Sequence, residues 1–113
     1  MIAVRGALML AALVACASAY ADELTPVQAQ GKQVYSHWCI YCHAPGVWGT
    51  NRLARRIDKD HAVLENRTDL TAAGIRAVVR AGVGSMPPLR RTEISDADLD
   101  AIAAYLTRQR AAQ

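Results

Sequence analysis

Two cysteines and a histidine stand close together in the segment Cys39-Ile40-Tyr41-Cys42-His43. Two thiols three positions apart at the end of a helix can add to the two vinyl groups of a haem, and the histidine that follows then lies under the iron. Covalent haem attachment is therefore the chemistry that this spacing favours. It predicts one haem c as the cofactor, with Cys39 and Cys42 as attachment residues and His43 as an iron ligand.

The same two thiols are compatible with three other kinds of site. They could form a structural disulfide, share a zinc ion, or act as the dithiol of a haem-free thiol-disulfide oxidoreductase. Zinc is the weakest of these, because only His37 and His61 could complete the ligand set and neither has the usual paired spacing. The oxidoreductase is the main alternative, although its motif normally lies at a strand-to-helix junction and the residues before Cys39 have a helical pattern.

Met86 is the expected second axial ligand of the iron. Met1 and Met9 lie in an N-terminal segment that we expect to be removed, so Met86 carries the only thioether of the mature domain. It stands in a stretch of glycines and prolines, residues 82–88, which cannot be helical. His61 is the other candidate for this position.

The N-terminal segment has the pattern of a secretory signal peptide, which we assign to residues 1–21. An arginine precedes the apolar run Gly6–Ala15, and small residues suited to a cleavage site follow it. We therefore expect a periplasmic mature domain, residues 22–113. An alternative uses the segment that ends at Cys16, which resembles a bacterial lipoprotein box and would give a lipid-anchored protein.

The length of 113 residues allows one small domain. After the first twenty residues there is no apolar run long enough to span a bilayer, so membrane contact is expected only if Cys16 is lipidated. Without the predicted signal peptide the chain has 12 basic and 10 acidic side chains, and this nearly neutral charge gives no support to nucleic-acid binding.

The mature chain has the pattern of helices connected by loops, with no strand-like alternation. Suitable capping residues precede three helical patterns, and Gly82 follows the second. The patterns predict helices over about 26–38, from Thr71 to Gly82, and after Ser95. Residues 44–60 lack a sustained period, which predicts a loop with one short turn near 52–57.

Residues from about 26 to 108 resemble class I c-type cytochromes, which are small bacterial electron carriers. Beside the cysteines and the histidine, the resemblance rests on Gly31 and Tyr35 before the motif, Met86-Pro87 after it, and Tyr105-Leu106 in the last helix. It implies a small all-α cytochrome c fold around one haem. In this fold the N- and C-terminal helices cross closely, Gly31 allows the approach, and the two tyrosines fill the contact.

The segment order and short length are also similar to the cytochrome subunits of flavocytochromes that oxidise para-alkylphenols, such as 4-cresol dehydrogenase or eugenol hydroxylase. The resemblance implies one-electron transfer with a redox partner protein, here a flavoprotein dehydrogenase or hydroxylase subunit, and no catalysis by this chain itself. Arg80, Arg90 and Arg91 are the charges that we expect to orient such a partner.

One segment departs from the family. Many members have Gly-Pro-x-Leu after the motif, and the carbonyl of that proline holds the proximal imidazole. This chain has Asn51 in place of the proline, so the structure must show whether residue 51 keeps this contact with His43. Farther from the motif, Leu53, Ile75 and Val79 are expected to wall the haem, while Trp48 is expected to pack beside it or to bind a haem propionate.

Overall fold

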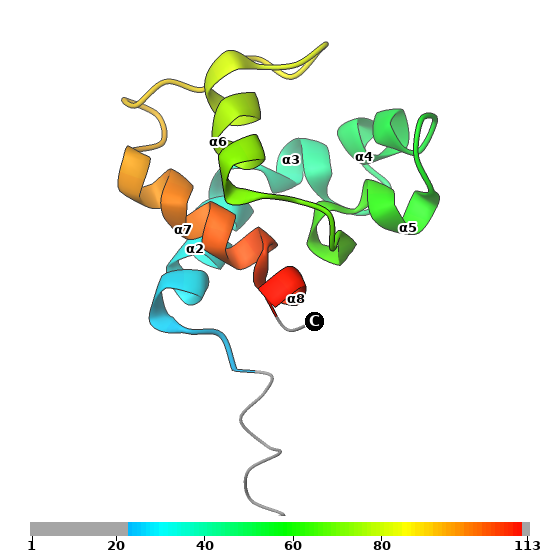
Figure 1. Ribbon diagram of the computed structural model, residues 1–113. Helices are drawn as coiled ribbons and strands as arrows, with labels where there is room; N and C mark the ends of the chain where they lie inside the picture. The colour runs from blue at the N-terminus through cyan, green and yellow to red at the C-terminus, as the bar shows by residue number, and fades with distance from the viewer. Residues whose placement is uncertain (1–22, 112–113) are drawn as a thin grey trace, which may run out of the picture.

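The computed structural model describes residues 23–111, and in this part of the chain every regular element is a helix. The predicted signal peptide and Cys16 lie outside the described residues. The elements are α2 (Pro26–Trp38), α3 (Ile40–His43), α4 (Trp48–Leu53), α5 (Lys59–Ala62), the 3₁₀ helix η2 (Leu64–Asn66), α6 (Ala72–Ala81), α7 (Asp96–Leu106) and α8 (Arg108–Ala111) (Figure 1). The all-α prediction is confirmed. None of these helices is long and apolar enough to cross a membrane.

The first long helix, α2, crosses the last long helix, α7, at very short range (Figure 1). A β-carbon at Gly31 would overlap the backbone carbonyl of Ala101, so only glycine allows this approach. Farther along the crossing, the rings of Tyr35 and Tyr105 pack with their centroids 5.9 Å apart. The contact expected from the family resemblance is therefore present.

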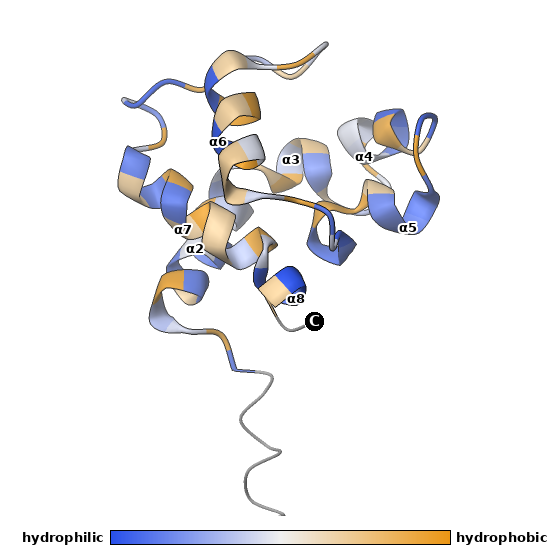
Figure 2. Ribbon diagram, viewed as in Figure 1, coloured by the Kyte–Doolittle hydropathy of each residue, from blue (hydrophilic) through white to orange (hydrophobic). Residues whose placement is uncertain are grey.

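The hydrophobic core lies where α6 packs against this helix pair. Ile75 and Val79 are buried on one face of α6, and α7 buries most of its apolar residues. Figure 2 shows hydrophilic residues on the same helices beside these apolar ones, as expected for amphipathic helices that cover a core. The core thus connects α2, α6 and α7 into one packed unit.

Each predicted helix begins at its predicted cap. Thr25 and Gln28 form a reciprocal capping box at the start of α2. The hydroxyls of Thr71 and Ser95 accept hydrogen bonds from backbone N–H groups at the third position of α6 and α7. The predicted bounds of these three helices are confirmed because side-chain caps fix the first turn of each.

The predicted loop over residues 44–60 is wrong in part, because it contains α4 and the first two residues of the short α5. No side chain caps the start of α4. Instead, the buried Thr50 donates a hydrogen bond of 2.8 Å from its hydroxyl to the carbonyl of Ala44, and Gly49 packs directly against the carbonyl of Cys42. Tertiary contacts, which sequence periodicity does not reveal, therefore stabilise this helix.

Gly31→Ala is expected to lower the free energy of unfolding of the haem-loaded protein by about 3 kcal/mol, because the added methyl group forces α2 away from α7. Urea unfolding followed by circular dichroism measures this loss. Gly74→Ala is the matched control, since its β-carbon would meet only the Thr71 hydroxyl at 3.0 Å and alanine favours a helix. Equal stability of the two variants would contradict the assigned role of Gly31.

Candidate functional site

The cysteine–histidine motif lies at the junction between α2 and α3. Cys39 ends α2, where its backbone N–H donates to the carbonyl of Tyr35, and His43 is the last residue of α3. Within this turn the N–H of His43 donates to the carbonyl of Cys39 at 2.8 Å. Both thiols are free, with that of Cys39 packed against the core and Cys42 exposed. The short helix thus fixes the thiols and the imidazole relative to one another.

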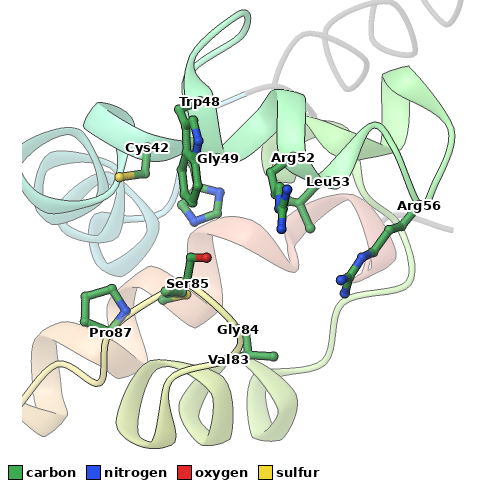
Figure 3. A pocket seen from close by; sticks show the side chains of 12 residues that line it. Cys42, Trp48, Gly49, Arg52, Leu53, Arg56, Val83, Gly84, Ser85 and Pro87 are labelled. Atoms are coloured by element: carbon green, nitrogen blue, oxygen red, sulfur yellow. The ribbon is translucent and has the colours of Figure 1, made fainter.

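The motif faces an open pocket whose free space, including solvent at its mouth, is about 810 Å³. One wall comes from α3, α4 and the turn after α4. The other comes from residues 83–87, in the segment that follows α6 (Figure 3). Of the four predicted site residues, Cys42, His43 and Met86 line this pocket, whereas Cys39 is not among its lining residues. The remaining lining residues are Trp48, Gly49, Arg52, Leu53, Arg56, Val83, Gly84, Ser85 and Pro87.

Met86 is held by a hydrogen-bonded turn that is anchored to α6. Val83 and Met86 exchange two backbone hydrogen bonds of 3.1 and 2.9 Å. Gly82 begins the turn with a φ of 73°, and a β-carbon there would lie 2.7 Å from the carbonyl of Met86. On the far side of Met86, the N–H of Leu89 donates to the carbonyl of Val79 at 2.8 Å. Both ends of the Met86 segment are therefore attached to the same helix.

The imidazole of His43 is in a state that suits a metal ligand. Burial lowers its pKa because desolvation disfavours the charged ring, so the neutral form is favoured. Its Nδ1 atom is buried and has no hydrogen-bond partner among the described residues. The hydroxyl of Tyr35 reaches only the backbone carbonyl of His43, at 3.4 Å. A neutral imidazole, a thioether and the Cys42 thiol line one mainly apolar pocket, and the Cys39 thiol lies in the adjoining turn, so the donor set fits haem c.

Asn51 does not replace the proline carbonyl that supports the proximal histidine in the family. Its backbone N–H donates to the carbonyl of Val47, and its side-chain amide donates to the carbonyl of Gly46, each at 2.9 Å. No hydrogen bond joins residue 51 to His43, whose Nδ1 atom stays without a partner among residues 23–111. The contact between residue 51 and the imidazole of His43 is therefore not formed among the described residues.

The pocket wall differs in part from the sequence prediction. Leu53 lines the pocket as expected, but Ile75 and Val79 belong to the core and are not among its lining residues. Sequence reasoning missed Arg52 and Arg56 as lining residues. Arg52 lies on α4 and Arg56 lies in the turn that follows it, so neither could be placed at the pocket while residues 44–60 were expected to form a loop.

The other histidines lie away from this pocket. His61 is on α5, where its Nδ1 atom is 3.7 Å from a carboxylate oxygen of Asp58 and its side chain is half exposed. His37 is exposed on α2 and packs edge-on against Trp38. Neither lines the pocket, and residues 23–111 contain no cluster of three or more His, Cys, Asp or Glu side chains that could hold a metal ion. The zinc alternative therefore lacks a ligand set in this part of the chain.

The thiol-disulfide alternative also fits the geometry poorly. A nucleophilic cysteine of that class has a lowered pKa and lies at the start of a helix that follows a strand. Here Cys39 follows the end of α2, and burial, with a smaller contribution from Cys42, raises the pKa of its thiol to about 11. The thiolate needed for disulfide exchange is therefore scarce at neutral pH.

Comparison with known proteins identifies the family. No curated protein and no solved structure matches the chain. Residues 26–106, which run from the first residue of α2 to the last residue of α7, match the family described as cytochrome c oxidase, cbb3-type, subunit III. The chain therefore belongs to this family of c-type cytochromes, and it is a haem-based electron-transfer protein.

Proposed function

We propose that residues 22–113 form a periplasmic one-electron carrier with a single haem c. Cys39 and Cys42 attach the haem covalently, while His43 and Met86 are its axial ligands. The observation that carries this proposal is the pocket lined by His43 from α3 and by Met86 from the facing segment. Bound there, haem supplies an Fe(III)/Fe(II) couple that accepts and releases one electron.

The side chains of the pocket set the preference between the two oxidation states. The Met86 thioether donates less electron density to Fe(III) than an imidazole does, so it favours Fe(II) and raises the reduction potential. The apolar side chains of Leu53 and Val83 limit the access of water, which disfavours the additional positive charge of the ferric state. His43 stays neutral, because burial lowers its pKa.

A pyridine haemochrome spectrum tests this function directly. The full chain is expressed with the periplasmic haem c maturation machinery, and the expected product is one covalently bound haem per chain. A haem-free protein that catalyses the reduction of insulin disulfides would instead support the oxidoreductase alternative. Cell fractionation and N-terminal sequencing of the mature protein separate cleavage near residue 21 from lipid anchoring at Cys16.

The electron partner that we propose is a larger redox enzyme. The flavocytochrome resemblance suggests a flavoprotein that oxidises alkylphenols, whereas the family description suggests a terminal oxidase. Stopped-flow mixing of the ferric cytochrome with a flavoprotein of that type and 4-cresol measures the transfer. Rapid reduction that requires both the flavoprotein and the substrate supports the first partner. Absence of haem reduction in the mixture that contains both the flavoprotein and 4-cresol would contradict this choice of partner.

His61→Ala is expected to leave the iron ligation unchanged. The residue lies on α5 near Asp58 and does not line the pocket, so the variant should keep the near-infrared absorption band of thioether-ligated ferric haem. Its midpoint potential should stay within about 15 mV of the wild-type value, a change of less than ~0.4 kcal/mol. A wild-type protein that lacks the band, together with a changed spectrum and potential in His61→Ala, would make His61 the ligand and contradict the assignment to Met86.

A further inference from the structure

The arginines between residues 52 and 91 fall into two groups, and only Arg108 and Arg110, which form no ion pair and do not line the pocket, follow them in the range 23–111. The last five arginines of this stretch are paired with nearby carboxylates: Arg67 with Asp69, Arg76 with Asp100, Arg80 and Arg91 with Asp96, and Arg90 with Glu93. In contrast, the side chains of Arg52, Arg55 and Arg56 make no ion pair and no hydrogen bond with any residue in the range 23–111, and all three residues are exposed. We call these three residues the basic rim.

The expectation that Arg80, Arg90 and Arg91 orient a partner stays a prediction, but their ion pairs leave them less available to a partner than the basic rim. The guanidinium group of Arg80 donates to the carbonyls of Leu89 and Ile94 and to the carboxylate of Asp96. It therefore connects the end of α6 to the start of α7, and a partner would have to displace these internal contacts. None of the three lines the pocket.

The basic rim lies at the mouth of the haem pocket. Arg52 and Arg56 line the pocket itself (Figure 3), and Arg55 lines a shallow hollow beside it together with Trp48 and Arg52. The pocket mouth also carries two exposed apolar side chains, Trp48 at 58% exposure and Val83 at 60%. Apolar side chains bordered by arginines form a pattern that is common at protein interfaces, where tryptophan and arginine are enriched.

The acidic residues next to the rim form no ion pair with it. The carboxylate of Asp58 accepts hydrogen bonds from the backbone N–H groups of Asp60 and His61 and so caps α5. Asp60 itself forms no ion pair with a described residue. The rim therefore presents three guanidinium groups that can bind carboxylates of another molecule without first breaking an internal pair.

We infer that the basic rim is the docking surface for a carboxylate-rich patch on the redox partner, with Trp48 and Val83 at the centre of the contact. This inference rests on the proposed function, because it places the partner over the haem pocket. The nearly neutral balance of the whole domain gives little long-range attraction, so the local field of the rim orients the encounter. The molecule that binds to the basic rim is thus a protein with an acidic surface.

Oxidation of the ferrous protein by two small reagents of opposite charge tests the inference. One electron passes from the haem iron to hexacyanoferrate(III), giving hexacyanoferrate(II), or to tris(phenanthroline)cobalt(III), giving the cobalt(II) complex. At low ionic strength, R52Q/R55Q/R56Q should react about 10-fold more slowly with the anion and faster with the cation. The rate with the anion should also become almost independent of salt, because the attraction that salt screens is removed.

The control R76Q/R90Q/R91Q removes the same number of positive charges from paired positions away from the pocket. It should change both rates less than about 2-fold, and R52K/R55K/R56K should retain the wild-type salt dependence. Equal effects of the two glutamine variants would overturn the inference. A second result would also overturn the inference: the rim variant keeps the wild-type salt dependence but has a shifted midpoint potential or a lower haem content. The rim arginines would then bind the haem propionates and not a partner protein. Absence of covalent haem from the wild-type protein would instead refute the proposed function.

Discussion

Replacement of either motif cysteine by serine is expected to leave little haem-loaded protein. In the proposed holoprotein each thiol forms one of the two thioether bonds, and the α2–α3 junction holds both thiols in fixed positions beside His43. Serine cannot form the thioether, so covalent capture of the haem becomes incomplete. Expression of Cys39→Ser, Cys42→Ser and the double variant with the maturation machinery, followed by pyridine haemochrome spectra, measures the covalent haem per chain.

The same variants should reveal how much the fold depends on the haem. The domain is small, and a chain of this size buries little apolar surface without an additional stabilising group. Far-ultraviolet circular dichroism of the double variant should therefore show a large loss of helix, because the binding free energy of the haem contributes to folding. Cys16→Ser is the matched control, with normal haem content expected. A normal haem yield from the double variant would exclude haem c.

Met86→His is expected to remove the near-infrared band of the ferric protein and to lower its midpoint potential. Imidazole stabilises Fe(III) relative to Fe(II) better than a thioether does, so the change favours the oxidised state. We expect a decrease on the order of 100 mV, within the roughly 0.8 V range that axial ligands cover. Each ~59 mV of a one-electron potential corresponds to about 1.4 kcal/mol. Spectroelectrochemical titration measures both quantities.

Met86→Leu separates ligation from packing. Leucine has a similar volume and keeps the apolar contact of residue 86 with the core, but it has no sulfur. The backbone bonds between residues 83 and 86 do not involve the side chain and should persist. This variant should lose the band while its unfolding midpoint changes little. If Met86→Leu and Met86→Ala both kept the wild-type spectrum and potential, the sixth ligand would be another group.

The helices that could be predicted from the sequence are those with a side-chain cap at the N-terminus. The start of α2, α6 and α7 could be predicted because each has a side-chain cap before an apolar pattern. The helix α4 could not be predicted in this way. It is held by the contact of Gly49 with α3 and by the hydrogen bond from Thr50 to Ala44, the residue after α3. Short helices of this kind have no independent stability, so their residues carry no periodic signal.

The candidate site was predictable to a similar extent. Cys39, Cys42, His43 and Met86 could be chosen from their residue types and spacing, without knowledge of the fold. The pocket lining by Arg52 and Arg56 could not, because it depends on the unpredicted α4. The hydrogen bonds of Arg80 could not be predicted either, because their acceptors are 9 to 16 residues away along the chain.

The attachment of the Met86 segment to α6 connects the two pocket walls through the helix core. From Met86 the path of contacts runs through α6 to α7, across the Gly31 crossing to α2, and from there into α3 and His43. The separation of the two proposed ligands is thus set by helix packing on the opposite side of the molecule. In the proposed holoprotein, helices packed in this way would limit nuclear reorganisation when the charge of the iron changes, so residues far from the metal would contribute to the activation barrier of electron transfer.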